Sequence, residues 1–314
     1  MCDAVRAPRP TTLVLCVCLL CLVWGSTWIV IAEGLRDLPP FTSAGLRFVI
    51  AAVGMAIVAA AFADREGGEH PPRRLVVVMG TLNFGLSYGI VYWVETRVPS
   101  SLVAVLWAVF PLMLAVASRR DLPGERLRGS QWLGLVTGFL GVVVLFTKDL
   151  RQLGTGAVVG GAVLLVSPFV SAIGTVAVKR DGAAVSSLRL NRNAMVIGAV
   201  LLLVAAALFE RGMPVHFTPR AIASLLYLAL MGTVLTFGLY YWAMRYAPAY
   251  QLALIAYVTP GIAIALGAWG ADEPVSGYTI LGFALILSGV GAVLRRGGAG
   301  FRARADSGAT EEPG

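Results

Sequence analysis

Charged side chains are scarce in this sequence. Only 13% of its 314 residues are charged, 58% are hydrophobic, and the mean hydropathy is +0.80. Soluble globular domains carry about 25% charged residues, so a chain of this length with half that fraction cannot cover a water-facing surface. The deficit excludes a soluble globular protein and indicates a membrane protein.

Residues that carry out metal or acid-base chemistry are also rare. Both histidines, His70 and His216, lie in polar loops, and no aspartate falls within a predicted membrane span. Three cysteines (Cys16, Cys18 and Cys21) share one apolar run without a second cluster of ligands, so we expect no metal site. The H-E-x-x-H motif is absent, and we expect no cofactor. A membrane-embedded enzyme acting on a lipid or lipid-linked substrate therefore remains only the alternative function.

Long apolar runs take the place of the missing charges. Ten of them approach the roughly 20 residues that a helix needs to cross the hydrocarbon core, whereas the strands of a membrane barrel alternate over ~10 residues. The sequence therefore predicts an all-α membrane protein with ten transmembrane helices. The expected spans are 11–33, 40–63, 75–95, 99–118, 131–147, 154–178, 187–209, 219–243, 249–270 and 277–294.

The basic residues indicate how these spans are oriented. The net charge is +8, but Lys and Arg lie mainly in loops between spans, which is typical of a topology signal rather than a nucleic-acid surface. The N-terminus, the even-numbered loops and the C-terminal tail hold most of them. This bias predicts a multi-pass plasma (inner) membrane protein whose two termini are cytoplasmic. Residues 1–10 are the expected cytoplasmic N-terminus. The polar, glycine-rich residues 296–314 are expected to form a disordered cytoplasmic tail.

One sequence pattern occurs twice. GIVYWVETRVP (89–99) and GLYYWAMRYAP (238–248) share a glycine, a Tyr-Trp pair and a proline at the same relative positions, and Pro111 and Pro260 follow at the same interval. The interval covers five predicted helices, an odd number, so the second copy must insert upside down. Inverted repeats are a recurrent plan of secondary transporters. We therefore expect two inverted five-helix repeats, residues 11–147 and 154–295, around a central cavity.

The repeated Tyr-Trp pairs themselves are expected at the membrane edges. Inversion places Tyr92-Trp93 near the outer face and Tyr241-Trp242 near the inner face, and both residue types favour membrane interfaces. The proline of each copy then suits the first turn of the next helix. We interpret the pattern as a mirrored membrane-edge turn rather than as the binding site.

The candidate substrate site lies near mid-membrane. Trp107 and Tyr257 stand shortly before Pro111 and Pro260, and a proline frees a backbone carbonyl one turn earlier. Such groups are tolerated where they face protein or a wet cavity. The alternative is that these prolines, together with Pro168, only kink their helices, and that the polar side chains only join neighbouring helices. The candidate substrate-binding residues are Trp24, Trp28, Asn83, Ser87, Trp107, Ser167, Thr233, Thr236, Tyr240 and Tyr257.

Arg47 is a charge inside a predicted span. Such a charge needs a partner, and we expect either Glu33 or Glu95, which stand at span ends. The pair would be structural, or Arg47 would hold a substrate carboxylate or a gate. Glu95 has Met244 as its counterpart in the second copy, which makes it a candidate for an outer gate or a proton-responsive group. Because no other carboxylate lies inside a span, we expect facilitated movement, exchange or weak coupling.

The motif order resembles a known family. WGSTW at 24–28, LRF at 46–48, and the segments 98–145 and 247–294 are similar to the EamA-type transporters of the drug/metabolite transporter superfamily. The resemblance implies an EamA-like repeat in each half and movement of amino acids or small metabolites, often outward. We therefore predict a secondary transporter, an exporter or exchanger working by alternating access. Its expected partners are a small-molecule substrate and the lipid bilayer, with no nucleic acid, and its expected state is a monomer or homodimer.

Overall fold

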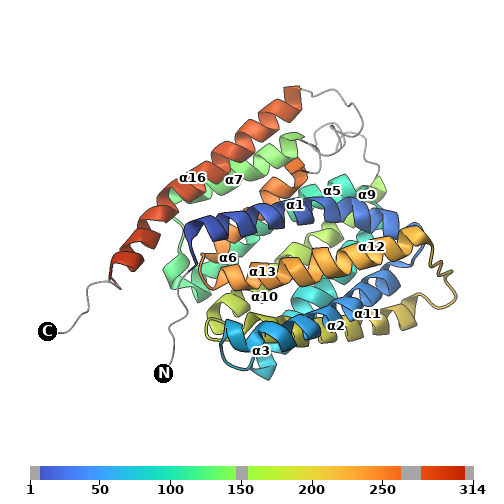
Figure 1. The fold of residues 1–314 in the computed structure, drawn as a ribbon. Helices are drawn as coiled ribbons and strands as arrows, with labels where there is room; N and C mark the ends of the chain where they lie inside the picture. The colour runs from blue at the N-terminus through green and yellow to red at the C-terminus, as the bar shows by residue number, and fades with distance from the viewer. Residues whose placement is uncertain (1–7, 146–154, 263–276, 308–314) are drawn as a thin grey trace.

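The protein is a bundle of helices in a computed structural model that describes residues 8–145, 155–262 and 277–307 (Figure 1). Apart from a parallel bridge between Glu69 and Val185, the described residues form no β-structure. This confirms the all-α prediction. The expected span ends at 146–147, 154 and 263–270 lie outside the described ranges.

The helices of the first half cover residues 10–145. They are α1 (Pro10–Gly34), α2 (Pro40–Glu66), α3 (Arg73–Val78), η1 (Met79–Leu86), α4 (Ser87–Glu95), α5 (Ser100–Trp107), α6 (Phe110–Asp121), η2 (Pro123–Glu125) and α7 (Gly129–Leu145). The helices of the second half are α9 (Thr155–Leu164), α10 (Val166–Asp181), α11 (Ser187–Phe209), α12 (Pro219–Ala229), η3 (Leu230–Leu235), α13 (Thr236–Met244), α14 (Ala249–Ala253) and α16 (Gly277–Ser307).

Many of these helices suit a bilayer. In the described part of the chain, 7 helices are long and apolar enough to cross it, and shorter apolar helices cover Gly129–Leu145, Ala249–Ile262 and Ile280–Leu294. Large apolar side chains such as Leu15, Ile57 and Val158 are exposed along them, which fits contact with lipid. The 7 long helices are Pro10–Gly34, Pro40–Glu66, Arg73–Glu95, Leu102–Asp121, Val158–Asp181, Ser187–Phe209 and Pro219–Met244.

One prediction about the C-terminus is wrong in part. The sequence predicted a disordered tail from residue 296, but α16 continues as a helix to Ser307. Extending an existing helix costs much less than nucleating a new one, so a polar segment can continue an apolar helix. The last residues of the expected tail, 308–314, are outside the described ranges.

Two glutamates join α2 and α11 at both ends. Glu66, the last residue of α2, accepts hydrogen bonds at the start of α11 from Ser186 Oγ (2.7 Å), from the Ser187 amide (3.1 Å) and hydroxyl, and from the Leu188 amide (3.2 Å). Glu210, directly after α11, accepts hydrogen bonds at the start of α2. Its donors are the amide of Phe41 (2.6 Å) and the amide and hydroxyl of Thr42 (2.8 and 2.6 Å).

Each carboxylate therefore caps the partner helix, where the unpaired N–H groups favour a negative charge. The two helices run antiparallel as a result. We call the end of the bundle with Glu66 the Glu66 face, and the opposite end the Glu210 face.

Glycines let α7 and α16 pack closely along one edge of the bundle (Figure 1). A Cβ atom on Gly134 would lie 2.8 Å from the carbonyl oxygen of Gly289, and a Cβ on Gly141 would lie 2.8 Å from that of Gly282. Such close approach of helices is what small residues permit in a membrane. In the sequence, Gly134 matches Gly282 and Gly141 matches Gly289, so the two contacts join equivalent pairs of positions.

Several spans are irregular near their middle. The third and eighth expected spans widen into the π-helices η1 and η3, which precede the two Tyr-Trp pairs. The helix also breaks between α5 and α6 just before Pro111, and at Leu165 just before Pro168. In the helix of Pro260, the irregular turn lies earlier, at Leu254. π-Helical turns are frequent at functional sites, and these breaks surround the cavity described next.

Candidate functional site

A cavity of about 120 Å³ lies between the two halves of the bundle. It is somewhat smaller than an apolar protein cavity of about 150 Å³ that holds benzene. The lining comes from α1, α2, η1, α4, α5, α6, α10, α13 and the helix Ala249–Ile262, so both halves contribute. The predicted residues that line it are Trp24, Trp28, Arg47, Asn83, Ser87, Trp107 and Tyr240.

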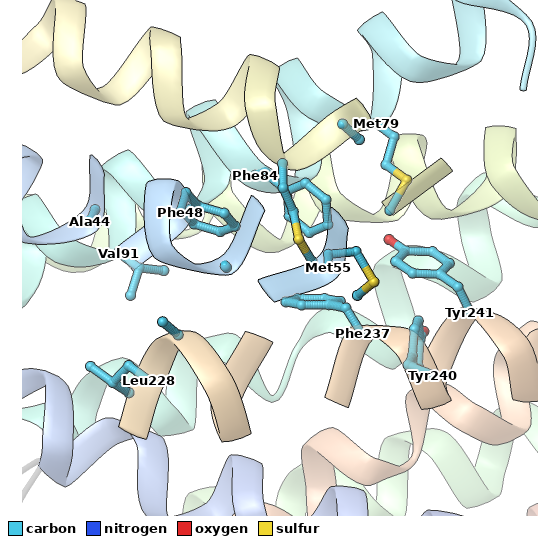
Figure 2. Packing of buried hydrophobic residues seen from close by; sticks show 14 of the residues in the cluster. Ala44, Phe48, Met55, Met79, Phe84, Val91, Leu228, Phe237, Tyr240 and Tyr241 are labelled. Carbon is cyan, nitrogen blue, oxygen red and sulfur yellow. The ribbon is translucent and has the colours of Figure 1, made fainter. Parts of the chain in front are cut away.

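Aromatic rings make up much of the wall. The ring centroids of Trp28 and Trp107 are 6.4 Å apart, and those of Trp24 and Tyr240 are 5.3 Å apart. Phe237, which also lines the cavity, meets Phe84 edge-on at 5.0 Å in the packed interior (Figure 2). Tilted and edge-on rings are the arrangements that aromatic pairs prefer. The wall is therefore both apolar and well packed.

A network of hydroxyl groups joins α4 to α10 beside this wall. Ser87 and Ser167 share a hydrogen bond of 2.8 Å, and Ser171 Oγ donates to Ser87 Oγ at 2.9 Å. Trp107 Nε1 donates to Ser167 Oγ at 3.0 Å, which fixes the indole at the cavity edge. Ser167 is fully buried and stands behind the lining rather than in it. Asn83 Nδ2 has three longer contacts, each of 3.3 Å, to Ser171 O, Thr175 Oγ1 and Tyr241 Oη.

Arg47 is almost completely buried, with 1% of its surface exposed. Its Nε donates to Thr233 Oγ1 at 2.8 Å, and its terminal nitrogens donate to Tyr92 Oη at 3.1 Å and to the Gly232 carbonyl at 3.0 Å. The guanidinium group also lies over the Tyr88 ring, 4.8 Å from its centroid. The acceptors in these bonds are neutral, so no ion pair fixes Arg47 within the described residues.

The two carboxylates expected to pair with Arg47 do not do so. Glu33 lies at the surface and pairs with Arg36 at 3.0 Å and with Arg220 at 3.8 Å, because it is on the outer side of α1. Glu95 is buried, with 9% of its surface exposed, and neither of its oxygens has a hydrogen-bond partner in the described structure. The prediction of an Arg47–Glu33 pair is wrong, and Arg47 and Glu95 are not bonded to each other.

Besides Ser167, three more predicted binding residues lie outside the cavity lining. Thr233 accepts the bond from Arg47 and donates to the Leu228 carbonyl at 2.8 Å, and Thr236 is buried behind the lining. Tyr257 is fully buried, and its hydroxyl donates to the Leu135 carbonyl at 2.8 Å. Its ring fills the space where a side chain on Gly138 would be. Tyr257 therefore anchors α7, because it faces that helix and not the cavity.

The structure also corrects the interpretation of the Tyr-Trp pairs. Tyr92 is 0% exposed and Tyr241 is 3% exposed, so both tyrosines face the protein interior and not lipid or water. Tyr92 bonds Arg47, and Tyr241 lines the cavity. Only the tryptophans of the two pairs are half-buried. Tyr88 and Tyr92 are one helical turn apart, and this spacing next to an intramembrane arginine was an available signal for the site.

Metal chemistry has no support in the described ranges, where no group of three or more His, Cys, Asp or Glu side chains could hold an ion. Taken together, the contacts above describe an aromatic cavity between the two halves of the chain, with the buried guanidinium group of Arg47 at its edge.

Comparison with known proteins identifies the family. The model of the EamA-like transporter family matches residues 11–147 and again residues 158–295. The chain belongs to the EamA-like transporter family. Members of this family are membrane transporters, and the family assignment gives no support to an enzymatic role.

Curated relatives agree with this assignment. An uncharacterized transporter, YoaV, of Bacillus subtilis (strain 168) is 28% identical over 86% of this chain and 92% of its own length. An uncharacterized inner membrane transporter, YedA, of Escherichia coli (strain K12) is 28% identical over 86% of this chain and 87% of its own. A probable amino-acid metabolite efflux pump of the same E. coli strain is 27% identical over 87% and 91%.

A solved structure shares the EamA fold seen here. A chain described only as a crystal structure of protein superposes with a TM-score of 0.77 at 20% identity, covering 92% of this chain and 98% of the other. At that identity the match speaks for the fold alone.

Proposed function

We propose that this EamA-family protein is a secondary transporter that moves amino acids or related small metabolites across the plasma (inner) membrane, outward or in exchange. The observation that carries the proposal is the cavity between the halves, which both halves line. A site at the interface of two repeats is the usual arrangement of secondary transporters, because rocking one half against the other exposes the site to each side in turn.

The packing of equivalent elements supports two inverted five-helix repeats, residues 11–147 and 154–295, and hence ten spans. The exchanged glycine contacts of α7 and α16 and the reciprocal caps of α2 and α11 both follow from a two-fold axis in the membrane plane. The three shorter apolar helices complete the ten spans. Loops on the Glu66 face hold most of the Lys and Arg residues, which supports a cytoplasmic location for this face and for both termini.

The chemistry of the cavity favours a small solute with a carboxylate. Arg47 is the one charged side chain in the lining of the described cavity. A guanidinium group has five N–H donors, and only some of those on Arg47 are used by Thr233, Tyr92 and Gly232. The others are available to bind a carboxylate beside the aromatic wall. The name of the E. coli efflux pump is consistent with an amino-acid-like substrate.

Alternating access also requires a closed gate, and contacts on the Glu66 face support a gate there. Lys179 Nζ donates to the carbonyls of Met244 (2.5 Å) and Ala247 (2.9 Å), and it pairs with Glu125 at 3.3 Å. Glu125 also accepts from the Ala249 amide at 2.7 Å, at the start of α14. We name these contacts the Lys179 clamp. They tie η2 of the first half to α10 and α14 of the second.

The test is counterflow in liposomes. Purified protein is reconstituted into vesicles loaded with each unlabelled amino acid in turn, and uptake of the labelled compound is measured. At least one compound should accumulate transiently. Substituting Trp107→Ala should raise its half-saturating concentration about tenfold, since aromatic contacts worth about 1.4 kcal/mol correspond to that factor.

Trp242→Ala is the matched control. Trp242 is a half-buried indole that packs on Tyr246 at 5.2 Å and does not line the cavity. If no amino acid or related metabolite undergoes counterflow, the proposed substrate class is rejected. If the two tryptophan variants behave alike at equal membrane abundance, the proposed location of the site is rejected.

A further inference from the structure

Glu95 is a buried acid that the substrate site does not use. It ends α4 on the Glu210 face, directly before the exposed residues Thr96 and Arg97. Its side chain is nevertheless shielded, and both carboxyl oxygens lack hydrogen-bond partners in the described residues. A buried carboxyl group without partners is rare in proteins and calls for a functional or structural reason.

The charged groups around Glu95 are few. α2 contributes Arg47, whose charge acts on Glu95 although the two do not bond. α4 itself contributes Tyr88 and Tyr92, which are directed at Arg47. Among the other helices packed against α4, neither η1, α5 nor the described part of α9 has a titratable side chain.

The remaining charges near this region are engaged elsewhere. The titratable side chains of α10 lie at its far end, where Lys179 is held in the clamp and Arg180 pairs with Asp121. Arg97 stacks on the Trp93 ring, 3.8 Å from its centroid, and donates to the Trp93 carbonyl at 2.7 Å. No cation therefore pairs with Glu95 in this conformation of the described chain.

The ionised form of Glu95 is costly in such a place. Moving a carboxylate out of water is strongly unfavourable unless an opposite charge and hydrogen bonds compensate it. The neutral acid avoids this cost, so the conformation seen here favours a proton on Glu95. A change that brings the carboxyl group to Arg47 or to water would favour release of that proton.

We propose that Glu95 binds and releases one proton in each transport cycle and so couples transport to the proton gradient. The proton passes between the carboxyl group and solvent at the Glu210 face, one residue from exposed backbone. The counterpart Met244 is buried and cannot titrate, so the coupling belongs to one half only. The inference rests on the proposed transport function. It chooses the proton-responsive role among those expected for Glu95, and it goes beyond the weak coupling expected from the scarcity of acids in the spans.

The experiment separates exchange from coupling. Vesicles containing the full chain are held at zero membrane potential, and the probe is an equimolar mixture of labelled standard amino acids. Counterflow without a pH gradient measures exchange, and accumulation after a pH step of either sign measures coupling. For a step of one pH unit and one proton per substrate, the wild type should accumulate substrate up to about tenfold.

Three variants sharpen the result. Glu95→Gln should lose the accumulation driven by the pH step, whereas Glu95→Asp, which keeps a carboxyl group, should retain part of it. Glu33→Gln is the control, because Glu33 is an exposed carboxylate at the same end of the bundle. This variant should accumulate substrate like the wild type.

The outcomes are distinct. Absence of counterflow in the wild type counts against the proposed function itself. Counterflow without gradient-driven accumulation, or full accumulation by Glu95→Gln, overturns the role of Glu95. Infrared spectra of the wild type at neutral pH should also contain a protonated-carboxyl band, even if Glu95→Gln does not fold. A spectrum with only ionised carboxylates would overturn the proposal as well.

Discussion

The glycine contact between α7 and α16 makes a quantitative prediction about stability. A Cβ atom on Gly289 would lie 2.5 Å from the Gly134 carbonyl oxygen and 2.5 Å from the Gly138 nitrogen. Ordinary contacts of a Cβ begin at about 3.4 Å, so Gly289→Ala requires the two helices to separate by nearly 1 Å. Both neighbours are backbone atoms, which cannot rotate away as a side chain can. Overpacking of this kind costs about 1–3 kcal/mol.

The same helix supplies a matched control. A Cβ atom on Gly291 would meet nothing within 4 Å among the described residues, so Gly291→Ala adds a methyl group to open space. Both substitutions gain the same helix propensity, about 1 kcal/mol. The difference between the two variants therefore isolates the packing cost.

Thermal unfolding of the purified protein, followed by circular dichroism in one detergent, measures this difference. Gly289→Ala should unfold several degrees below Gly291→Ala, which should equal or exceed the wild type. Equal midpoints for the two variants would refute the close contact between α7 and α16.

Two further predictions concern the polar ends of the bundle. Hydrogen bonds from Arg220 and then Thr218 lower the pKa of Asp37 to about 2. The contact of the Asp37 carboxylate with Arg220 and Thr218 should persist above the ordinary aspartate pKa. It should be lost as the pH falls from about 4 to 2, because Asp37 then takes up a proton. The protection of the loop amides from hydrogen exchange, relative to their intrinsic exchange rates at each pH, should fall with this loss in the wild type and stay constant in Asp37→Asn. Separately, Lys179→Met should open the Glu66 face, so that a thiol reagent labels a cysteine placed at Ser171 at least severalfold faster. Arg180→Met, on the adjacent exposed side chain, should not change this rate.

The sequence predicted much of the fold because membrane spans have a strong signal. Runs of apolar residues located the helices, and the repeated Tyr-Trp pattern located elements that the structure places around one cavity. The indoles of Trp24, Trp28 and Trp107 were also predicted at the site, and they line the cavity. Their role in binding a substrate stays a prediction.

The two misplaced threonines, Thr233 and Thr236, have a common physical cause. Thr233, Thr236 and Tyr240 were all predicted to bind substrate, but η3 ends between the first two. The wider turn of a π-helix rotates the following residues, so Thr233 reaches Arg47 while Tyr240 reaches the cavity. Tyr92 was assigned to a membrane-edge turn because tyrosines favour membrane interfaces on average. In the structure its side chain is instead buried against Arg47.

The reciprocal caps of α2 and α11 restrict how the molecule can move. A slide of one helix along the other by a single residue, about 1.5 Å, would pull Glu66 and Glu210 out of reach of their donors at both ends at once. Tilting about the middle of the pair keeps both ends close to their partners. The two helices can therefore tilt against each other, whereas sliding of one half along the other is disfavoured.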